Sequence, residues 1–141
     1  MNRSLIILTM GVVGVMLGSA GLVRYIHKNP PAAEIVLNSD EEMRRFLSEY
    51  GKTSKDEPPL RIEITLPTEC GTSVFGTYCD VQKEQSLPLS EHFGEEVVMW
   101  TYTLNDLPTM RAELICTKDG LLVGAIRYDC INFDHMYPII T

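Results

Sequence analysis

The fold is decided by the stretch VVMWTYTLNDLPTMRAELICTKDGLLVGAIRYD, residues 97–129. Residues 97–104 are rich in β-branched and aromatic side chains, which is typical of a strand. Residues 110–117 and 121–129 have a similar composition, and the Asp-Gly pair between them is a strong signal for a tight hairpin turn. This stretch therefore predicts three consecutive antiparallel strands, a β-meander.

The residues before the meander predict two helices and one further strand. Ser39 followed by Glu42 is a capping box, and the apolar residues after it recur at helical spacing until a glycine ends the pattern. Residues 60–66 alternate between apolar and polar side chains, which predicts a half-buried strand. Residues 73–85 return to helical spacing, with residues 82–85 on the exposed face. We therefore expect an α+β fold in which a small antiparallel sheet packs with two helices.

Alternation along the meander divides its side chains between two faces of the sheet. One set is expected to face the second helix: Val98, Trp100, Tyr102, Ala112, Leu114 and Cys116. The other set is expected to point to the opposite face: Val97, Met99, Ile115, Leu122 and Ile126. The second set is too apolar to be left in water, so we expect the first helix to cover part of it, with contact to a partner as the alternative.

The N-terminal region contains an uncharged apolar stretch over residues 5–23. A helix of that length spans roughly 28 Å, close to the hydrocarbon thickness of a bilayer. We expect an uncleaved single-pass anchor, with a signal peptide cleaved after Ala20 as the alternative. Four glycines lie along one face of this predicted helix, and such a stripe of small residues would allow two copies to pair: Gly11, Gly14, Gly18 and Gly21.

The charged residues are divided unevenly along the chain. The first 28 residues have three basic side chains and no acidic one, whereas the remainder contains all 19 acidic and nine of the 12 basic residues, a net charge of −10. The chain thus divides into an anchor over residues 1–28, a linker over residues 29–38 and an acidic domain over residues 39–141, with a short strand at 35–37 as an alternative within the linker. Binding to nucleic acid requires clustered Lys and Arg, so a nucleic-acid partner is not expected.

The residue types that bind metals or perform catalysis are scattered. The four cysteines do not have zinc-site spacing, and the chain has neither a phosphate-binding glycine loop nor a calcium loop. Cys79 on the second helix and Cys116 on the sheet are expected to be buried free thiols, with a disulfide between them as the alternative. A thiol enzyme would need one of these cysteines beside His92 or His135. We therefore predict no catalytic residue, no metal site and no cofactor.

Five features of the second half of the chain form a recognisable pattern: Val81–Gln85, Leu89-Ser90, Thr101–Thr103, Arg111–Leu114 and Gly124. Together they resemble an uncharacterised domain family found in short membrane-anchored proteins of Gram-positive Firmicutes. The resemblance extends over roughly residues 35–139. No function is assigned to that family, so the resemblance implies a bacterial anchored domain that faces outward and transfers no catalytic residue.

These observations predict a single-pass protein of the cell membrane whose acidic extracytoplasmic domain is a binding or interaction module. Its expected contacts are the bilayer, through residues 5–23, an unidentified protein, and a second copy of the chain. The alternatives are a membrane-tethered hydrolase or thiol enzyme, and a homodimeric structural component.

Overall fold

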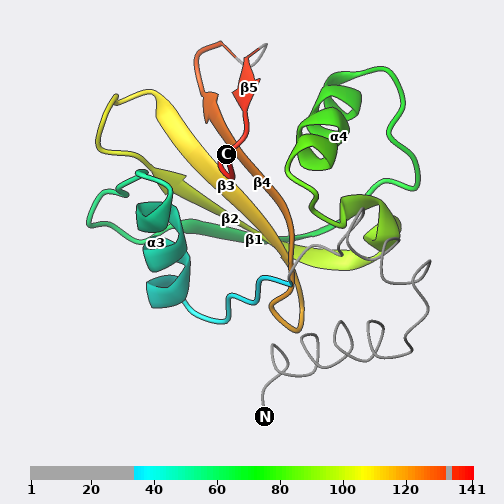
Figure 1. The fold of residues 1–141 in the computed structure, drawn as a ribbon, viewed down its shortest axis with the longest axis horizontal. Coiled ribbons are helices and arrows are strands. Elements are labelled where there is room, and N and C mark those ends of the chain that lie inside the picture. The colour runs from blue at the N-terminus through cyan, green and yellow to red at the C-terminus, as the bar shows by residue number, and fades with distance from the viewer. Residues whose placement is uncertain (1–33, 133–134) are drawn as a thin grey trace, which may run out of the picture. The chain divides into compact units, whose positions relative to one another are not determined.

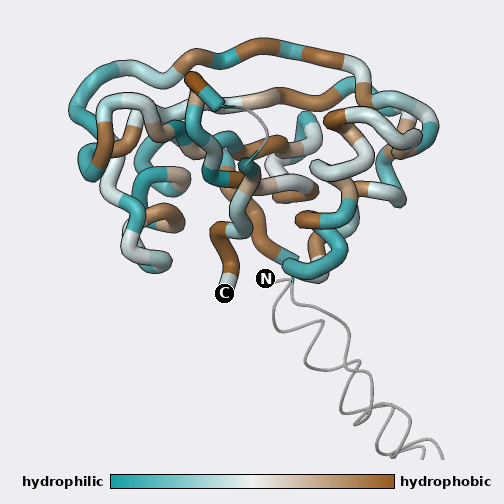
Figure 2. Tube along the Cα trace, turned by 90° about the horizontal axis from the view of Figure 1, so that it is seen from above, coloured by the Kyte–Doolittle hydropathy of each residue, from teal (hydrophilic) through white to brown (hydrophobic). Residues whose placement is uncertain are grey.

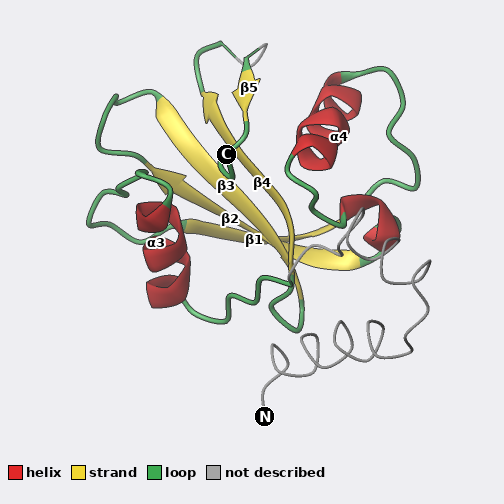
Figure 3. Cartoon of the chain, viewed as in Figure 1, coloured by secondary structure: helices red, strands yellow, loops and turns green. Residues whose placement is uncertain are grey.

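The computed structural model describes residues 34–132 and 135–141, which form an α+β unit with one five-stranded antiparallel sheet. Its elements in chain order are α3 (Asp40–Glu49), β1 (Leu60–Thr65), α4 (Val74–Glu84), the short 3₁₀ helix η1 (Leu89–His92), β2 (Glu96–Thr103), β3 (Met110–Thr117), β4 (Leu122–Asp129) and β5 (Met136–Tyr137). The strands lie side by side in chain order, and α3 and α4 lie on opposite sides of the sheet (Figure 1; Figure 3). The predicted α+β class, the two helices of the domain and the meander are confirmed, and β5 is an addition to them.

Local signals explain where the elements begin and turn. The N–H of Glu42 donates to Ser39 Oγ at 3.1 Å, and the Glu42 carboxylate accepts the N–H of Asn38 at 2.7 Å, so polar side chains satisfy the first turn of α3. The hairpin between β3 and β4 forms at Asp119 and Gly120, as predicted. Gly120 adopts a φ of +90°, a conformation that glycine reaches at little cost.

The sheet faces are covered by the helices in the reverse of the predicted arrangement. Residues predicted to face α4 instead pack with α3 in one buried cluster, which includes Tyr102, Ala112, Leu114 and Cys116 of the sheet and Met43, Phe46 and Leu47 of the helix. The opposite face packs with α4 in a second cluster, which includes Val97, Ile115 and Ile126 of the sheet and Tyr78, Cys79 and Val81 of the helix. The expected intramolecular cover of this second face exists, but α4 provides it.

Leu122 is also on the other side from its predicted one. Ile115 pairs with Gly124 while the next residue, Cys116, pairs with Leu122, so β4 contains the extra residue Val123 at this point. Such a β-bulge interrupts the alternation of side chains. As a result Leu122 joins the α3 cluster, although Ile126 on the same strand packs with α4.

Strand β1 is more exposed than the half-buried strand that its alternation predicts. Leu60 is 61% exposed and Ile62 is 37% exposed, and Ile64 is only partly buried against the α4 cluster. Helix α4 packs on β4 and β5, whereas β1 is at the opposite edge of the sheet. The pattern of the residues indicates a strand but not how far a helix extends over it.

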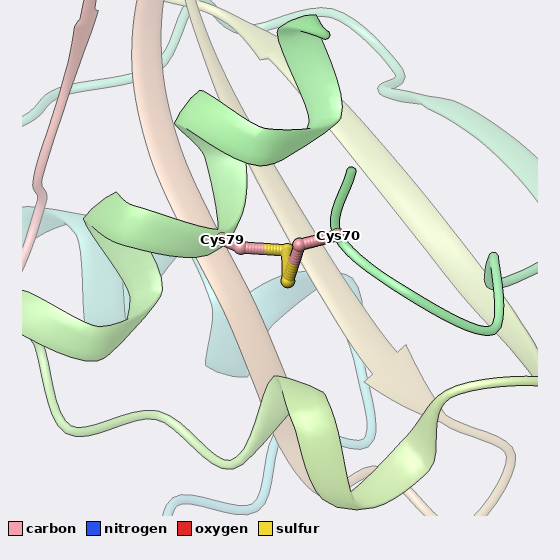
Figure 4. The surroundings of a disulfide bond; sticks show 2 residues. All are labelled: Cys70 and Cys79. Atoms are coloured by element: carbon pink, nitrogen blue, oxygen red, sulfur yellow. A yellow bond between two sulfur atoms is a disulfide. The ribbon is translucent and has the colours of Figure 1, made fainter. Parts of the chain in front are cut away.

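Cys79 is not the free thiol that was expected, and the alternative pairing with Cys116 is also wrong, because the two residues lie on opposite sides of the sheet. Cys79 of α4 forms a disulfide with Cys70 in the preceding loop, at a Cα–Cα distance of 6.1 Å (Figure 4). Cys116 is a free thiol buried in the α3 cluster, and Cys130 is a partly exposed free thiol.

The folded unit begins at Ile35. Val36 forms a single β-bridge with Leu121 and Leu37 is buried, so this part of the predicted linker packs on the domain. Within residues 34–132 and 135–141, no helix is both long and apolar enough to cross a bilayer. The predicted span at residues 5–23 and its four glycines lie outside the described residues.

Candidate binding pocket

Two buried glutamines, Gln82 and Gln85, fix α4 to the sheet and to the C-terminal segment; we call them the glutamine pair. Gln82 Oε1 accepts the N–H of Ala125 at 2.8 Å, and Gln85 Nε2 donates to the carbonyl of the same residue at 2.7 Å. Gln85 Oε1 accepts the N–H groups of Ile139 and Ile140 at 2.7 and 2.8 Å. One end of α4 is thus held by hydrogen bonds to strand and tail backbone.

The glutamine pair corrects the prediction that residues 82–85 form an exposed helix face. Lys83 and Glu84 are exposed, but Gln82 is 1% exposed and Gln85 is 6% exposed. Polar side chains at such positions are expected in solvent unless buried backbone groups need hydrogen-bond partners. The buried N–H and C=O groups of Ala125 are such groups.

Tyr78 lies against β4 because Gly124 has no side chain. A Cβ atom at Gly124 would overlap the Tyr78 hydroxyl. That hydroxyl is buried and has no hydrogen-bond partner among the described residues. Phe75 stacks on Tyr78 with a centroid distance of 5.9 Å. Two aromatic rings from α4 therefore form one wall above the sheet.

A pocket of about 390 Å³ lies between these rings and strands β3, β4 and β5. Its lining is mostly apolar and aromatic, and consists of Val74, Phe75, Tyr78, Glu113, Ile126, Tyr128 and Met136. Among these described lining residues, Glu113 is the only carboxylate and none is basic. The pocket therefore presents one acid within aromatic and aliphatic walls.

The pocket changes the acidity of its polar groups. Burial raises the pKa of the Glu113 carboxyl from 4.5 to about 7, because the ionised form loses hydration. Burial, and next the negative charge of Glu113, raise the pKa of both Tyr78 and Tyr128, so both phenols stay protonated at neutral pH. The site therefore combines two neutral phenols with a carboxyl group that changes its charge near pH 7.

The residues considered for thiol chemistry are not brought together. Cys79 is oxidised in the disulfide, and burial raises the pKa of the Cys116 thiol to about 12, so little of the nucleophilic thiolate forms at neutral pH. His92 Nδ1 lies 2.9 Å from Glu95 Oε1, and the His135 ring stacks on Tyr137. Within residues 34–132 and 135–141, no group of three or more His, Cys, Asp and Glu side chains is arranged to hold a metal ion.

Sequence reasoning did not identify Glu113 as a site residue. The signal was weak, because Glu113 shares a face of β3 with Ile115 but also with Arg111 and Thr117. The structure adds that α4 leaves space beside it.

No protein-family model matches this chain, and neither a curated protein nor a solved structure was found to be similar to it. The resemblance described above stays a prediction.

Proposed function

We propose that the chain is a single-pass membrane protein whose extracytoplasmic domain binds a small organic cation, such as an arylalkyl ammonium, in the pocket beneath α4. The proposal rests on one observation, the partly buried Glu113 carboxyl in an aromatic pocket whose described lining includes no basic side chain. A buried carboxylate is costly without a positive partner, and a cationic ligand would provide that partner.

The walls of the pocket favour a ligand with an apolar body. Phe75, Tyr78 and Tyr128 present aromatic rings, and Ile126 and Met136 present aliphatic surface. Aromatic faces attract cations and also pack against flat apolar groups. A ring that carries an ammonium group on a short chain would satisfy the walls and the carboxylate together.

The disulfide supports an outward-facing domain. Disulfides persist in oxidising compartments and are rare in the cytosol, where thiols are kept reduced. Cys70 and Cys79 are paired in the folded unit. Together with the uncharged stretch at residues 5–23, this pairing favours an anchored domain outside the cytoplasm.

Calorimetric titration of phenethylamine into the full chain, reconstituted in zwitterionic nanodiscs, tests the pocket. We expect Glu113→Gln to weaken binding by about tenfold or more, because an ion pair with a hydrogen bond is lost. Glu84→Gln, which changes an exposed glutamate on α4, is the matched control and should bind like the unmodified chain. Phenethyl alcohol, which has the same ring without the charge, should bind about tenfold more weakly than the amine.

The pH dependence gives an independent check. Lowering the pH from about 8 to about 6 protonates Glu113, whose pKa is about 7, and should weaken phenethylamine binding by about tenfold. Equal binding by the unmodified chain and Glu113→Gln, or equal binding of amine and alcohol, would refute the proposed ligand class.

The orientation is tested separately by adding trypsin to intact cells. An outward-facing domain is digested, whereas protection until the cells are broken would assign the domain to the cytoplasm. A non-reducing mass measurement of the undigested chain should show Cys70 and Cys79 inaccessible to alkylation until reductant is added.

A further inference from the structure

Apart from the pocket beneath α4, the outer edge of β1 is a surface with an unusual composition, because it combines a strand edge left unpaired by the described residues with exposed apolar side chains. Within the described residues β1 pairs only with β2, so its other edge has no strand beside it. The strand is not shielded on its α4 face either, because Leu60 and Ile62 are 61% and 37% exposed. An exposed edge with apolar residues is a surface on which another strand can pair.

The backbone groups that face outward can be identified. The N–H of Leu66 donates to the carbonyl of Glu95 in the direction of β2. In an antiparallel ladder, alternate residues direct both backbone groups to the same neighbour. Ile64 and Ile62 therefore share the direction of Leu66, and the N–H and C=O groups of Arg61 and Glu63 point away from β2.

The side chains of β1 fit a second copy of the same strand. Where two copies run antiparallel about a two-fold axis at Ile62, Arg61 of each copy lies opposite Glu63 of the other. On the opposite face, Leu60 of each copy lies opposite Ile64 of the other. Opposite charges and apolar groups facing each other across strands are both stabilising.

Other registers of the same pairing are unfavourable. Moving the axis to Arg61 or to Glu63 keeps the outward backbone groups paired but places like charges directly opposite, which is destabilising. A shift by one residue would leave the outward groups without partners. One register is therefore selected by charge and backbone geometry together.

We propose that two copies of this chain pair through their β1 edges, with Arg61 of one copy opposite Glu63 of the other, and join the two five-stranded sheets into one. This interface is distinct from the predicted glycine face at residues 11–21 and from the pocket beneath α4. Within its own chain Glu63 lies 3.8 Å from Arg61 and 3.5 Å from Lys118. All three side chains are nevertheless about half exposed and so accessible to a second copy.

Cysteine crosslinking tests the register in the full chain in nanodiscs, with the free thiol Cys130 changed to Ser. Ile62→Cys would bring its two Cα atoms to about 4.5 Å on the two-fold axis, within the range of a disulfide. We expect oxidation to give a covalent dimer with Ile62→Cys and little with Thr65→Cys, an exposed position on the same strand. Equal dimer from the two variants would overturn the proposal.

Charge reversal tests the pairing. Glu63→Arg in the Ile62→Cys background places Arg opposite Arg at both symmetric positions and should lower the crosslinked fraction by about tenfold. Combining it with Arg61→Glu exchanges the two charges, and crosslinking should return to its starting level. Failure of the exchange to restore the dimer would overturn the register.

A last variant distinguishes pairing through β1 from pairing through the predicted glycine face. Crosslinking through Ile62→Cys should persist when Gly14 and Gly18 are both changed to Ile. Its loss would assign dimer formation to the glycine face and overturn the β1 interface.

Discussion

Replacing Glu113 with Gln should stabilise the domain at alkaline pH and have little effect near pH 4.5. The unfolded glutamate ionises around pH 4.5, whereas the folded one keeps its proton until about pH 7, because burial raises its pKa. Between these values the folded state binds more protons than the unfolded state, so stability falls as the pH rises. Above about pH 8 this loss of stability is complete and no longer changes with pH. Glutamine has nearly the same shape and does not ionise, so it avoids this loss.

The magnitude follows from the difference between the two pKa values. A rise from 4.5 to about 7, at 1.36 kcal/mol for each unit, corresponds to about 3 kcal/mol of unfolding free energy. The benefit of Glu113→Gln over the unmodified chain should therefore grow by about 3 kcal/mol between pH 4.5 and pH 8. Such a change is a large fraction of the stability of a typical small domain.

The difference in unfolding free energy between the two proteins is measured by urea unfolding across this pH range. Circular dichroism monitors the unfolding, and both proteins are kept in one detergent. Subtracting the two curves removes the contribution of the other titrating groups, which both proteins share. Glu84→Gln, at an exposed position, should give a difference near zero at every pH. If the Glu113→Gln benefit is the same at pH 4.5 and pH 8, the carboxyl is not buried in the way that the pocket requires.

Three further changes test how the pocket is built, each measured by urea unfolding at pH 8. Gln85→Leu leaves buried backbone groups of β4 and the tail without partners and should destabilise the domain by about 3 kcal/mol; a loss below about 1 kcal/mol would contradict the bonds described for this residue. Reduction of the disulfide between Cys70 and Cys79, nine residues apart, should cost about 2.5 kcal/mol, and the double Ser variant should be unaffected by reductant. Gly124→Ala should displace the Tyr78 ring and cost about 2 kcal/mol, with a change in near-ultraviolet circular dichroism; an unchanged spectrum would show that the ring is not packed on this glycine.

The elements of the fold could be predicted because their signals are local. Asp119 and Gly120 specify a hairpin through the conformations available to a turn, and alternation specifies the strands beside it. Alternation also shows which side chains share a face. It does not show which helix covers that face, because this depends on how the connecting loops direct the chain. Figure 2 shows hydrophobic and hydrophilic residues interspersed along the folded part of the chain, and Leu60 and Ile62 of β1 are apolar yet exposed. Hydropathy alone therefore does not distinguish the covered part of the sheet from the exposed part.

The wrong prediction of which sheet face α4 covers explains two other errors, the Cys79–Cys116 alternative and the missed Glu113. Placing α4 over the face of Cys116 makes a Cys79–Cys116 disulfide reasonable, whereas the actual position of α4 puts the sheet between the two sulfurs. The same assignment placed Glu113 on the side away from α4, where an acid on a strand would not suggest a pocket. The bulge at Val123 has no strong sequence signal, since it depends on the pairing of two strands.

The residues that anchor α4 most firmly and the pocket residue that is most exposed lie on different parts of the helix. The glutamine pair and the disulfide hold the C-terminal half and the middle of the helix, through Gln85 and Cys79. The first turn has no side-chain cap at Ser73, and Val74 is 59% exposed while it lines the pocket. Substitutions at Val74 should therefore alter ligand binding with little change in unfolding free energy, whereas substitutions at Gln85 should change both. Because Val74 is exposed and belongs to neither buried cluster, this position is where a change of ligand preference would require the fewest compensating changes in the core.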